Sequence, residues 1–73
     1  MAKHLVMDRT GHSEHIFDKA NVVELAEAER RFAELTGKGF TAAKRTEPGK
    51  SEILRKFDPS VEETLFVPPL VGG

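Results

Sequence analysis

ANVVELAEAERRFAELT, residues 20–36, is the stretch of the chain with the clearest period. Its large apolar residues recur at steps of three and four, which puts them on one side of an α-helix: Val22, Leu25, Ala28, Phe32 and Leu35. Asn21 is a suitable N-cap, and Glu24 can reach back to it from three residues further on. Gly37 and Gly39 are typical of a helix end. We therefore expect a helix over about residues 20–36, with one apolar face to bury.

Residues 3–17, before this helix, alternate between apolar and polar types and predict a β-hairpin. Leu5 and Met7 fall on one face of the first strand, and the even-numbered residues fall on the other. Thr10-Gly11 predicts the turn, because glycine adopts a positive φ without a Cβ clash.

Three more strands are expected after the helix. Phe40–Arg45 is a short candidate, and the turn signal Glu47-Pro48-Gly49-Lys50 follows it, with proline and glycine where a type II turn needs them. Ile53–Phe57 alternates as a strand does, and Thr64–Val67 forms the last strand. The expected order is strand, strand, helix, strand, strand, strand.

This order predicts an α+β domain, because the helix and the strands each have one apolar face and can bury them together. We expect a mixed sheet of four to five strands packed on one helix over residues 1–67. Pro68 and Pro69 stop the last strand, since proline has no N–H to donate to a sheet. Residues 68–73 are then expected to form an extended C-terminal tail ending in Gly72-Gly73.

Composition excludes several classes of protein. The chain has 73 residues, so its core is small and leaves no room for a deep catalytic cleft; we expect no enzyme. Eleven Lys and Arg against twelve Asp and Glu argue against nucleic-acid binding. The absence of cysteine excludes disulfides, thiolate zinc sites and a thiol nucleophile. No apolar run resembles a signal peptide or a membrane span, so we expect a cytoplasmic protein without membrane contact.

Three histidines, His4, His12 and His15, are the candidate metal ligands of the chain. All three fall in the predicted hairpin, where exposed surface positions are the simpler interpretation. We therefore expect no metal site.

The C-terminal third carries a resemblance to a known family. The residues concerned are Phe57-Asp58-Pro59 and Leu65-Phe66-Val67-Pro68-Pro69-Leu70-Val71-Gly72-Gly73. They resemble the small subunit of molybdopterin synthase and, more distantly, the thiamine-pathway sulfur carrier and ubiquitin. The resemblance implies the β-grasp, or ubiquitin-like, fold, with the first and last strands parallel in the middle of the sheet. It also implies a carrier that is not itself a catalyst.

In such a carrier a partner enzyme adenylates the carboxylate of the terminal glycine with ATP, and the domain binds no cofactor of its own. Gly73 and Gly72 are the implied carrier residues, because a chain without side chains can enter a narrow channel and present an unhindered carbonyl carbon. The resemblance implies an adenylating enzyme as partner, with a synthase large subunit or a deubiquitinase-like peptidase as further possibilities. The expected partner-binding residues are Phe66, Pro68, Pro69, Leu70 and Val71. For Phe66, a place in the core is an equally open alternative.

Three functions remain open on the sequence. Gly73 is converted to a thiocarboxylate in a sulfur carrier, whereas in a ubiquitin-like modifier it is joined to lysines of other proteins. A non-covalent interaction module would instead use a face or an edge of its sheet.

Overall fold

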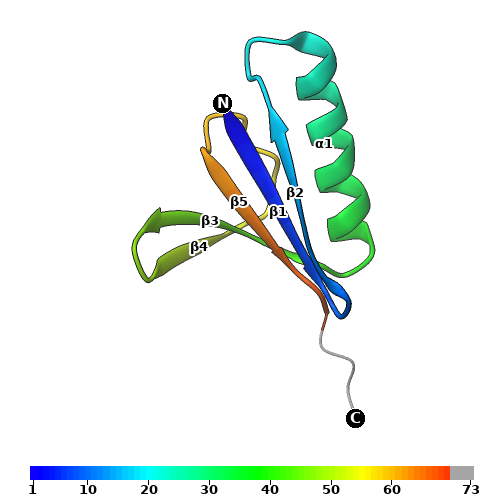
Figure 1. Ribbon diagram of the computed structural model, residues 1–73, viewed down its shortest axis with the longest axis vertical. Coiled ribbons are helices and arrows are strands. Elements are labelled where there is room, and N and C mark those ends of the chain that lie inside the picture. Colours follow the sequence, from blue (N-terminus) through cyan, green and yellow to red (C-terminus); the bar gives the residue numbers. More distant parts are fainter. Residues whose placement is uncertain (70–73) are drawn as a thin grey trace.

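The computed structural model describes residues 1–69. Six elements follow one another in the expected order (Figure 1). They are β1 (Ala2–Asp8), β2 (Gly11–Phe17), α1 (Val22–Gly37), β3 (Thr41–Glu47), β4 (Lys50–Leu54) and β5 (Glu63–Val67).

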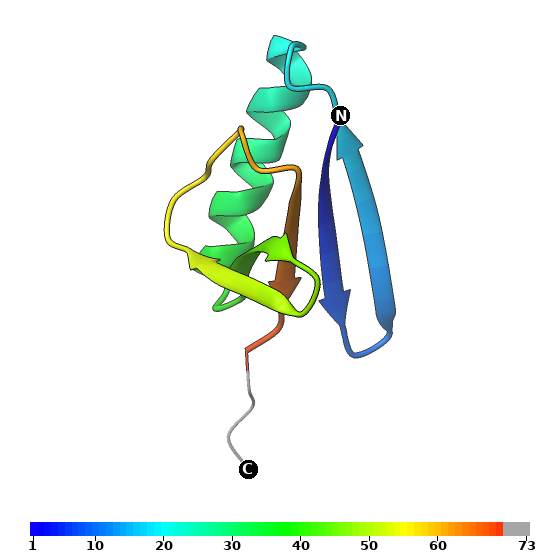
Figure 2. The same cartoon turned by 90° about the vertical axis from the view of Figure 1, so that its left-hand side faces the viewer.

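The five strands form one mixed sheet in the order β2-β1-β5-β3-β4. β1 and β5 are parallel neighbours in the middle, and the other pairs are antiparallel. The helix lies along one face of this sheet, and Figure 2 looks onto the opposite face, with α1 behind the strands. A parallel pair formed by the first and last strands requires a long connection, and α1, β3 and β4 supply it.

The β1–β2 hairpin forms where it was expected, but its turn lies one residue earlier. Asp8 pairs with Gly11, so the loop is Arg9-Thr10. The side chain of Asp8 holds this loop, because its Oδ1 accepts hydrogen bonds from the backbone N–H of Thr10 at 2.8 Å and from the Thr10 hydroxyl at 2.7 Å. The face assignment of β1 is confirmed, since Ala2 and Val6 point into the core.

Asn21 caps α1 as predicted: its Oδ1 accepts from the N–H groups of Val23 at 3.0 Å and Glu24 at 3.1 Å. Glu24 differs from the expectation, because it reaches past the cap and accepts from the N–H of Asp18 at 2.9 Å. The place of Val22 in the apolar stripe was wrong, since 80% of its surface is exposed. The first turn of α1 extends beyond the end of the sheet, so no strand lies beneath it (Figure 1).

The other end of α1 is closed by a Schellman motif. Gly39 has φ +97°, its N–H donates to Thr36 O at 3.1 Å, and the N–H of Phe40 donates to Leu35 O at 3.0 Å. This turn brings the chain from the helix into β3.

The turn between β3 and β4 is confirmed at Pro48-Gly49, where Gly49 has φ +81° between the paired residues Glu47 and Lys50. The strand expected at Ile53–Phe57 was wrong in position. So tight a turn lets pairing resume at once, and β4 therefore runs over Lys50–Leu54. Phe57 leaves the sheet and packs into the core from the following loop.

The core lies between α1 and the sheet and consists of two clusters that Phe57 joins. One cluster contains Val6, Phe32, Ala42 and Phe66, and the other contains Ala2, Phe17 and Ala28. The aromatic rings meet edge to face, with the Phe32 centroid 5.7 Å from that of Phe66 and 5.9 Å from that of Phe57. Four phenylalanines therefore fill most of this small core.

Candidate functional site

The candidate site begins where β5 ends. β5 lies between β1 and β3, and its last residue, Val67, pairs with Thr41. Pro68 and Pro69 follow without N–H groups, so they cannot extend the pairing. The chain leaves the sheet at the end where α1 also finishes and where the β1–β2 turn lies (Figure 1).

Gly39 fixes the base of this exit. A Cβ atom built on Gly39 would lie 3.3 Å from Cβ of Pro69 and 3.5 Å from its Cγ. The helix-ending turn and the exit are therefore in close contact. Gly39 is needed twice, for its positive φ and for the room it leaves to Pro69. The sequence indicated only the first of these roles, because the second depends on two segments that are 30 residues apart in numbering.

The residues expected to bind a partner fall into three groups. Phe66 is fully buried, with 0% of its surface exposed and its ring against those of His4 and Phe32, so we correct its assignment from docking to core. Pro68 is half-buried and Pro69 is exposed at the exit. Leu70, Val71, Gly72 and Gly73 lie outside the described residues.

A second feature is the face of the sheet away from α1, which we call the open face. Its apolar members come from all five strands: Leu5, Met7, Ile16, Ala43, Ile53, Leu65 and Val67. Strand register aligns four of them in one row, since Leu5 pairs with Leu65, Leu65 with Ala43, and Ala43 with Ile53. Ile53 is 65% exposed at the end of this row. Sequence reasoning missed this row, although the alternation of β1 and β5 already placed Leu5 and Leu65 opposite the core.

The open face continues to the exit. Met7 and Val67 lie at the end of the sheet that leads to Pro68, and both expose about two fifths of their surface. An apolar surface and the start of the tail are therefore contiguous.

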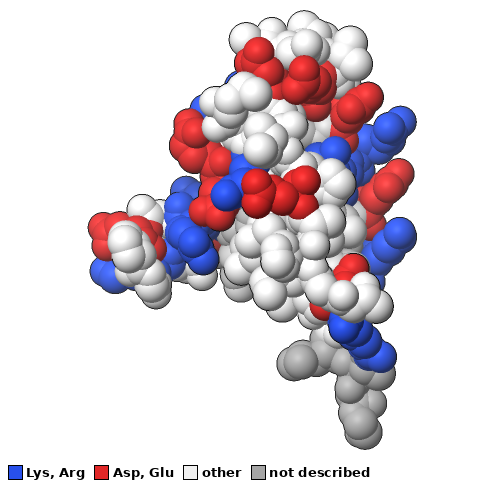
Figure 3. All heavy atoms as spheres, in the orientation of Figure 1, with Lys and Arg blue, Asp and Glu red and all other residues white. Residues whose placement is uncertain are grey.

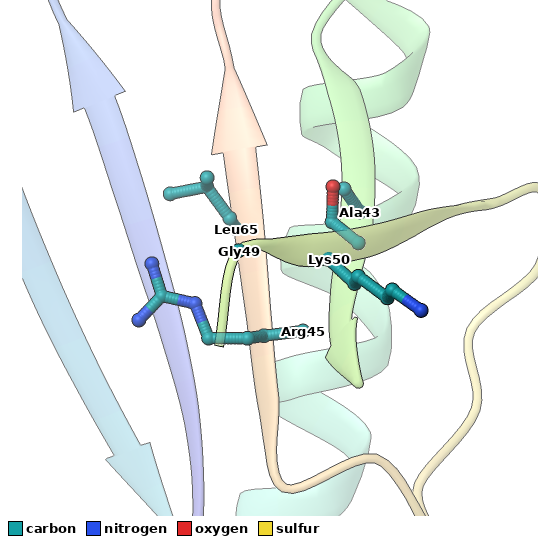
Figure 4. Close-up of a pocket in the computed structure, with 6 residues that line it drawn as sticks. Ala43, Arg45, Gly49, Lys50 and Leu65 are labelled. Atoms are coloured by element: carbon teal, nitrogen blue, oxygen red, sulfur yellow. The ribbon is translucent and has the colours of Figure 1, made fainter. Parts of the chain in front are cut away.

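The other end of the open face is charged. Glu63 lies between two cations, with Lys3 Nζ 3.7 Å from one carboxylate oxygen and Arg45 Nη1 3.7 Å from the other. A pocket of about 120 Å³ opens beside Arg45, under the β3–β4 hairpin, and Figure 4 shows Leu65 and Ala43 in its wall. Exposed ion pairs of this kind contribute only about 0–1 kcal/mol each to stability. They mark the polar end of an otherwise apolar face.

The fold places the three histidines in different environments. His12 is exposed and His15 is half-buried, but His4 is buried with 2% exposure, so its expected surface position was wrong. It shares the core-facing side of β1 with Ala2 and Val6, and its ring meets those of Phe17 and Phe66 at 4.9 and 5.0 Å. Nδ1 lies 3.4 Å from Arg31 Nη1, which can only donate.

Burial lowers the pKa of His4 to about 4, and the positive charge of Arg31 adds to the effect. The ring is therefore neutral at pH 7 and acts as a core residue. Within residues 1–69, no group of three or more His, Asp or Glu side chains is arranged to hold a metal ion.

Comparison with known protein families, with curated proteins and with solved structures gives no match. The helix found in residues 1–69 is neither long nor apolar enough to cross a membrane.

Proposed function

We propose that the chain is a β-grasp, ubiquitin-like carrier that presents the carboxylate of Gly73 to an activating enzyme. The observation that carries the proposal is the position of β5. It is a central strand, held on both sides, and it leads directly into Pro68 and Pro69. A carrier needs a rigid body and an extended end, and a central strand followed by two prolines provides the transition.

The chemistry begins on the partner. An oxygen of the Gly73 carboxylate attacks the α-phosphorus of ATP, and pyrophosphate leaves. Hydrosulfide supplied by the partner then attacks the carbonyl carbon of the acyl-adenylate, AMP leaves, the S–H proton is lost, and a thiocarboxylate remains. In a modifier, the amine of a lysine would make this second attack. The carrier supplies an unhindered carbonyl, and the partner supplies the donors that stabilise the developing charge.

The open face is the docking surface in this proposal. Met7 and Val67 flank the exit, and the apolar row of Leu5, Leu65 and Ala43 lies beyond them. Burial of this row against the activating enzyme would gain about 25 cal/mol per Å² of apolar surface removed from water. The body would thereby position the tail in the enzyme's channel.

Intact-mass measurement tests the proposal. The chain is co-expressed with candidate adenylating enzymes, and conversion of the carboxylate to a thiocarboxylate should add about 16 Da, since oxygen is replaced by sulfur. Deletion of Gly72-Gly73 is the matched control and should abolish the gain. Absence of the heavier species with every enzyme, together with absence of Gly-Gly remnants on lysines of other proteins, would overturn the carrier proposal.

A non-covalent binding module is the second candidate, and the exposure of Ile53 favours it. Ile53 lies on the edge strand β4, away from the exit. A module that docks through this edge of the open face would bind equally well after Gly72-Gly73 is deleted, whereas either carrier function would be lost.

A further inference from the structure

The outward face of α1 carries an apolar surface that the core does not use. Val22 and Val23 are 80% and 67% exposed, although valine is an uncommon choice for an exposed helix position. A shallow hollow of about 460 Å³ lies against them, lined by Val22, Val23, Ala26, Glu27 and Arg30. We call these five residues the outer helix patch. The patch lies on the side of the helix away from Ala28 and Phe32, which face the sheet.

Within the described part of the chain, the charges of this patch form no close ion pair, although Glu27 and Arg30 both act on Arg31 of the same helix through their charges. Among residues 1–69, the ion pairs within 4 Å involve neither Glu27 nor Arg30, and both side chains are exposed. Acidic and basic side chains alternate along the helix side of the molecule, and the area near the start of the helix is largely uncharged (Figure 3). The patch thus combines an apolar end with an exposed acid and an exposed base.

We propose that the outer helix patch binds the same patch of a second copy of the chain, with the two α1 helices antiparallel. We place Arg30 of one helix over Ala26 of the other. In this register the aliphatic part of the Arg30 side chain can pack on Ala26, and the guanidinium lies beside Glu27 of the other copy. The two-fold axis repeats the contact, so two acids and two bases alternate in a ring around it. The patch is complementary to itself in charge, and this singles out a second copy as the occupant.

The same register gives Val23 a partner. When Arg30 of one copy lies opposite Ala26 of the other, Val23 lies opposite Ala33, which is small and exposed. A large residue on each helix then meets a small one, and helix dipoles that run in opposite directions attract. The open face lies on the side of the sheet away from α1 and stays accessible in such a dimer.

The dimer should be weak. A contact along one 16-residue helix is small beside the roughly 1,200–2,000 Å² of stable complexes. We therefore expect a dissociation constant of about 0.1–1 mM. Sedimentation equilibrium between about 10 µM and about 2 mM should show the mass rising from 8.1 kDa toward twice that value. A constant 8.1 kDa over this range would overturn the proposal.

Charge reversal tests the ring directly. Glu27→Arg leaves four bases around the axis and Arg30→Glu leaves four acids, so each variant alone should stay monomeric. An equimolar mixture should associate again, because each heterodimer restores two opposite pairs. Recovery of dimer in the mixture is the result that a non-specific loss of association would not give; monomers in the mixture would contradict the antiparallel register.

Two further variants complete the experiment. Val23→Asp should weaken the dimer at least tenfold without unfolding the helix, since an acid is favourable in the first turn. Glu14→Arg on the open face makes the same change of charge elsewhere and should leave association unchanged. Loss of association in Glu14→Arg but not in Val23→Asp would place the contact on the sheet and would overturn the proposal. Far-UV circular dichroism checks that every variant stays folded.

Discussion

The two faces of the sheet use the same strands but differ in what they pack against. Along β5, Phe66 points to α1 and is fully buried, while Leu65, its neighbour in sequence, points to the open face and is half-buried. Across β1 the same contrast separates Val6 from Leu5. The helix face receives aromatic side chains from strands, helix and loop, whereas the open face has only its strands. Stability is therefore concentrated on one face, and exposed apolar surface is left on the other.

The largest effect should come from removing an aromatic residue on the helix face. Phe66→Ala should cost about 3–5 kcal/mol of unfolding free energy, because it leaves a cavity among Phe32, Val6 and Ala42. Leu65→Ala should cost less than half as much, since its surroundings are partly solvent. Urea denaturation followed by circular dichroism measures both. Phe66→Leu serves as the milder variant if Phe66→Ala does not fold, and equal losses on the two faces would contradict the comparison.

The second-largest effect should come from acid, which should lower the unfolding free energy through His4 on the helix face. The pKa of His4 is about 4 in the folded chain, against about 6.5 when the side chain is in water. As the pH falls from about 6.5 toward 4, the unfolded chain takes up a proton that the folded chain does not. Stability should therefore drop by up to about 3 kcal/mol over this range, and this dependence disappears above about pH 7.

Two variants isolate the histidine. His4→Leu should flatten the dependence of unfolding free energy on pH between 4 and 6.5, while His12→Gln at an exposed position should leave it unchanged. The pKa of His15 is also lowered by burial, so a smaller residual slope of the same sign should remain in His4→Leu. A slope that survives His4→Leu in full would show that other groups cause it.

The two faces meet at the exit, where Gly39 contacts Pro69. Substitution of Gly39 tests the packing at this point. Gly39→Ala should cost about 1–2 kcal/mol, because alanine is strained at φ +97° and its Cβ would press on Pro69. Gly37→Ala is the matched control: outside the helix's own backbone, no atom of residues 1–69 lies within 4 Å of a Cβ at this position, and the substitution should stabilise by up to about 1 kcal/mol. Thermal melts of both variants measure the difference, and a neutral Gly39→Ala would refute it.

The smallest effect should lie on the open face itself. Ile53→Thr removes exposed apolar surface on an edge strand, so unfolding free energy should change by less than about 0.5 kcal/mol in urea denaturation. Its expected consequence is in recognition: capture by a partner that docks on the open face should weaken. A loss of more than about 1 kcal/mol would mean that Ile53 belongs to the fold, and the contrast between the faces would need revision.

Much of the fold could be predicted because local signals agreed with it. The three-four spacing of Leu25, Ala28 and Phe32 gave the helix, and Pro48-Gly49 gave the turn, since φ preferences act within a few residues. Alternation in β1 gave its two faces. The order of all six elements followed from these signals.

Other features were out of reach of local signals. Ile53–Phe57 alternates convincingly, but pairing with β3 begins directly after the turn and ends at Leu54. Val22 fits the apolar stripe of α1, but the stripe extends past the end of the sheet, so Val22 is exposed. The candidate site could likewise be predicted only in part. Pro68 and Pro69 were recognised as residues that end the strand. The contact between Gly39 and Pro69 joins segments far apart in the sequence, and local spacing does not reveal that they meet.

The sequence by itself determined the order and type of the elements, the capped helix and the two prolines after the last strand, because these depend on backbone preferences and on side-chain period. Only the tertiary structure decided which apolar residues become core. It buried His4 and Phe66 and left Val22, Val23 and Ile53 exposed, because burial depends on which element lies opposite a side chain, and α1 covers one face of the sheet over part of its own length.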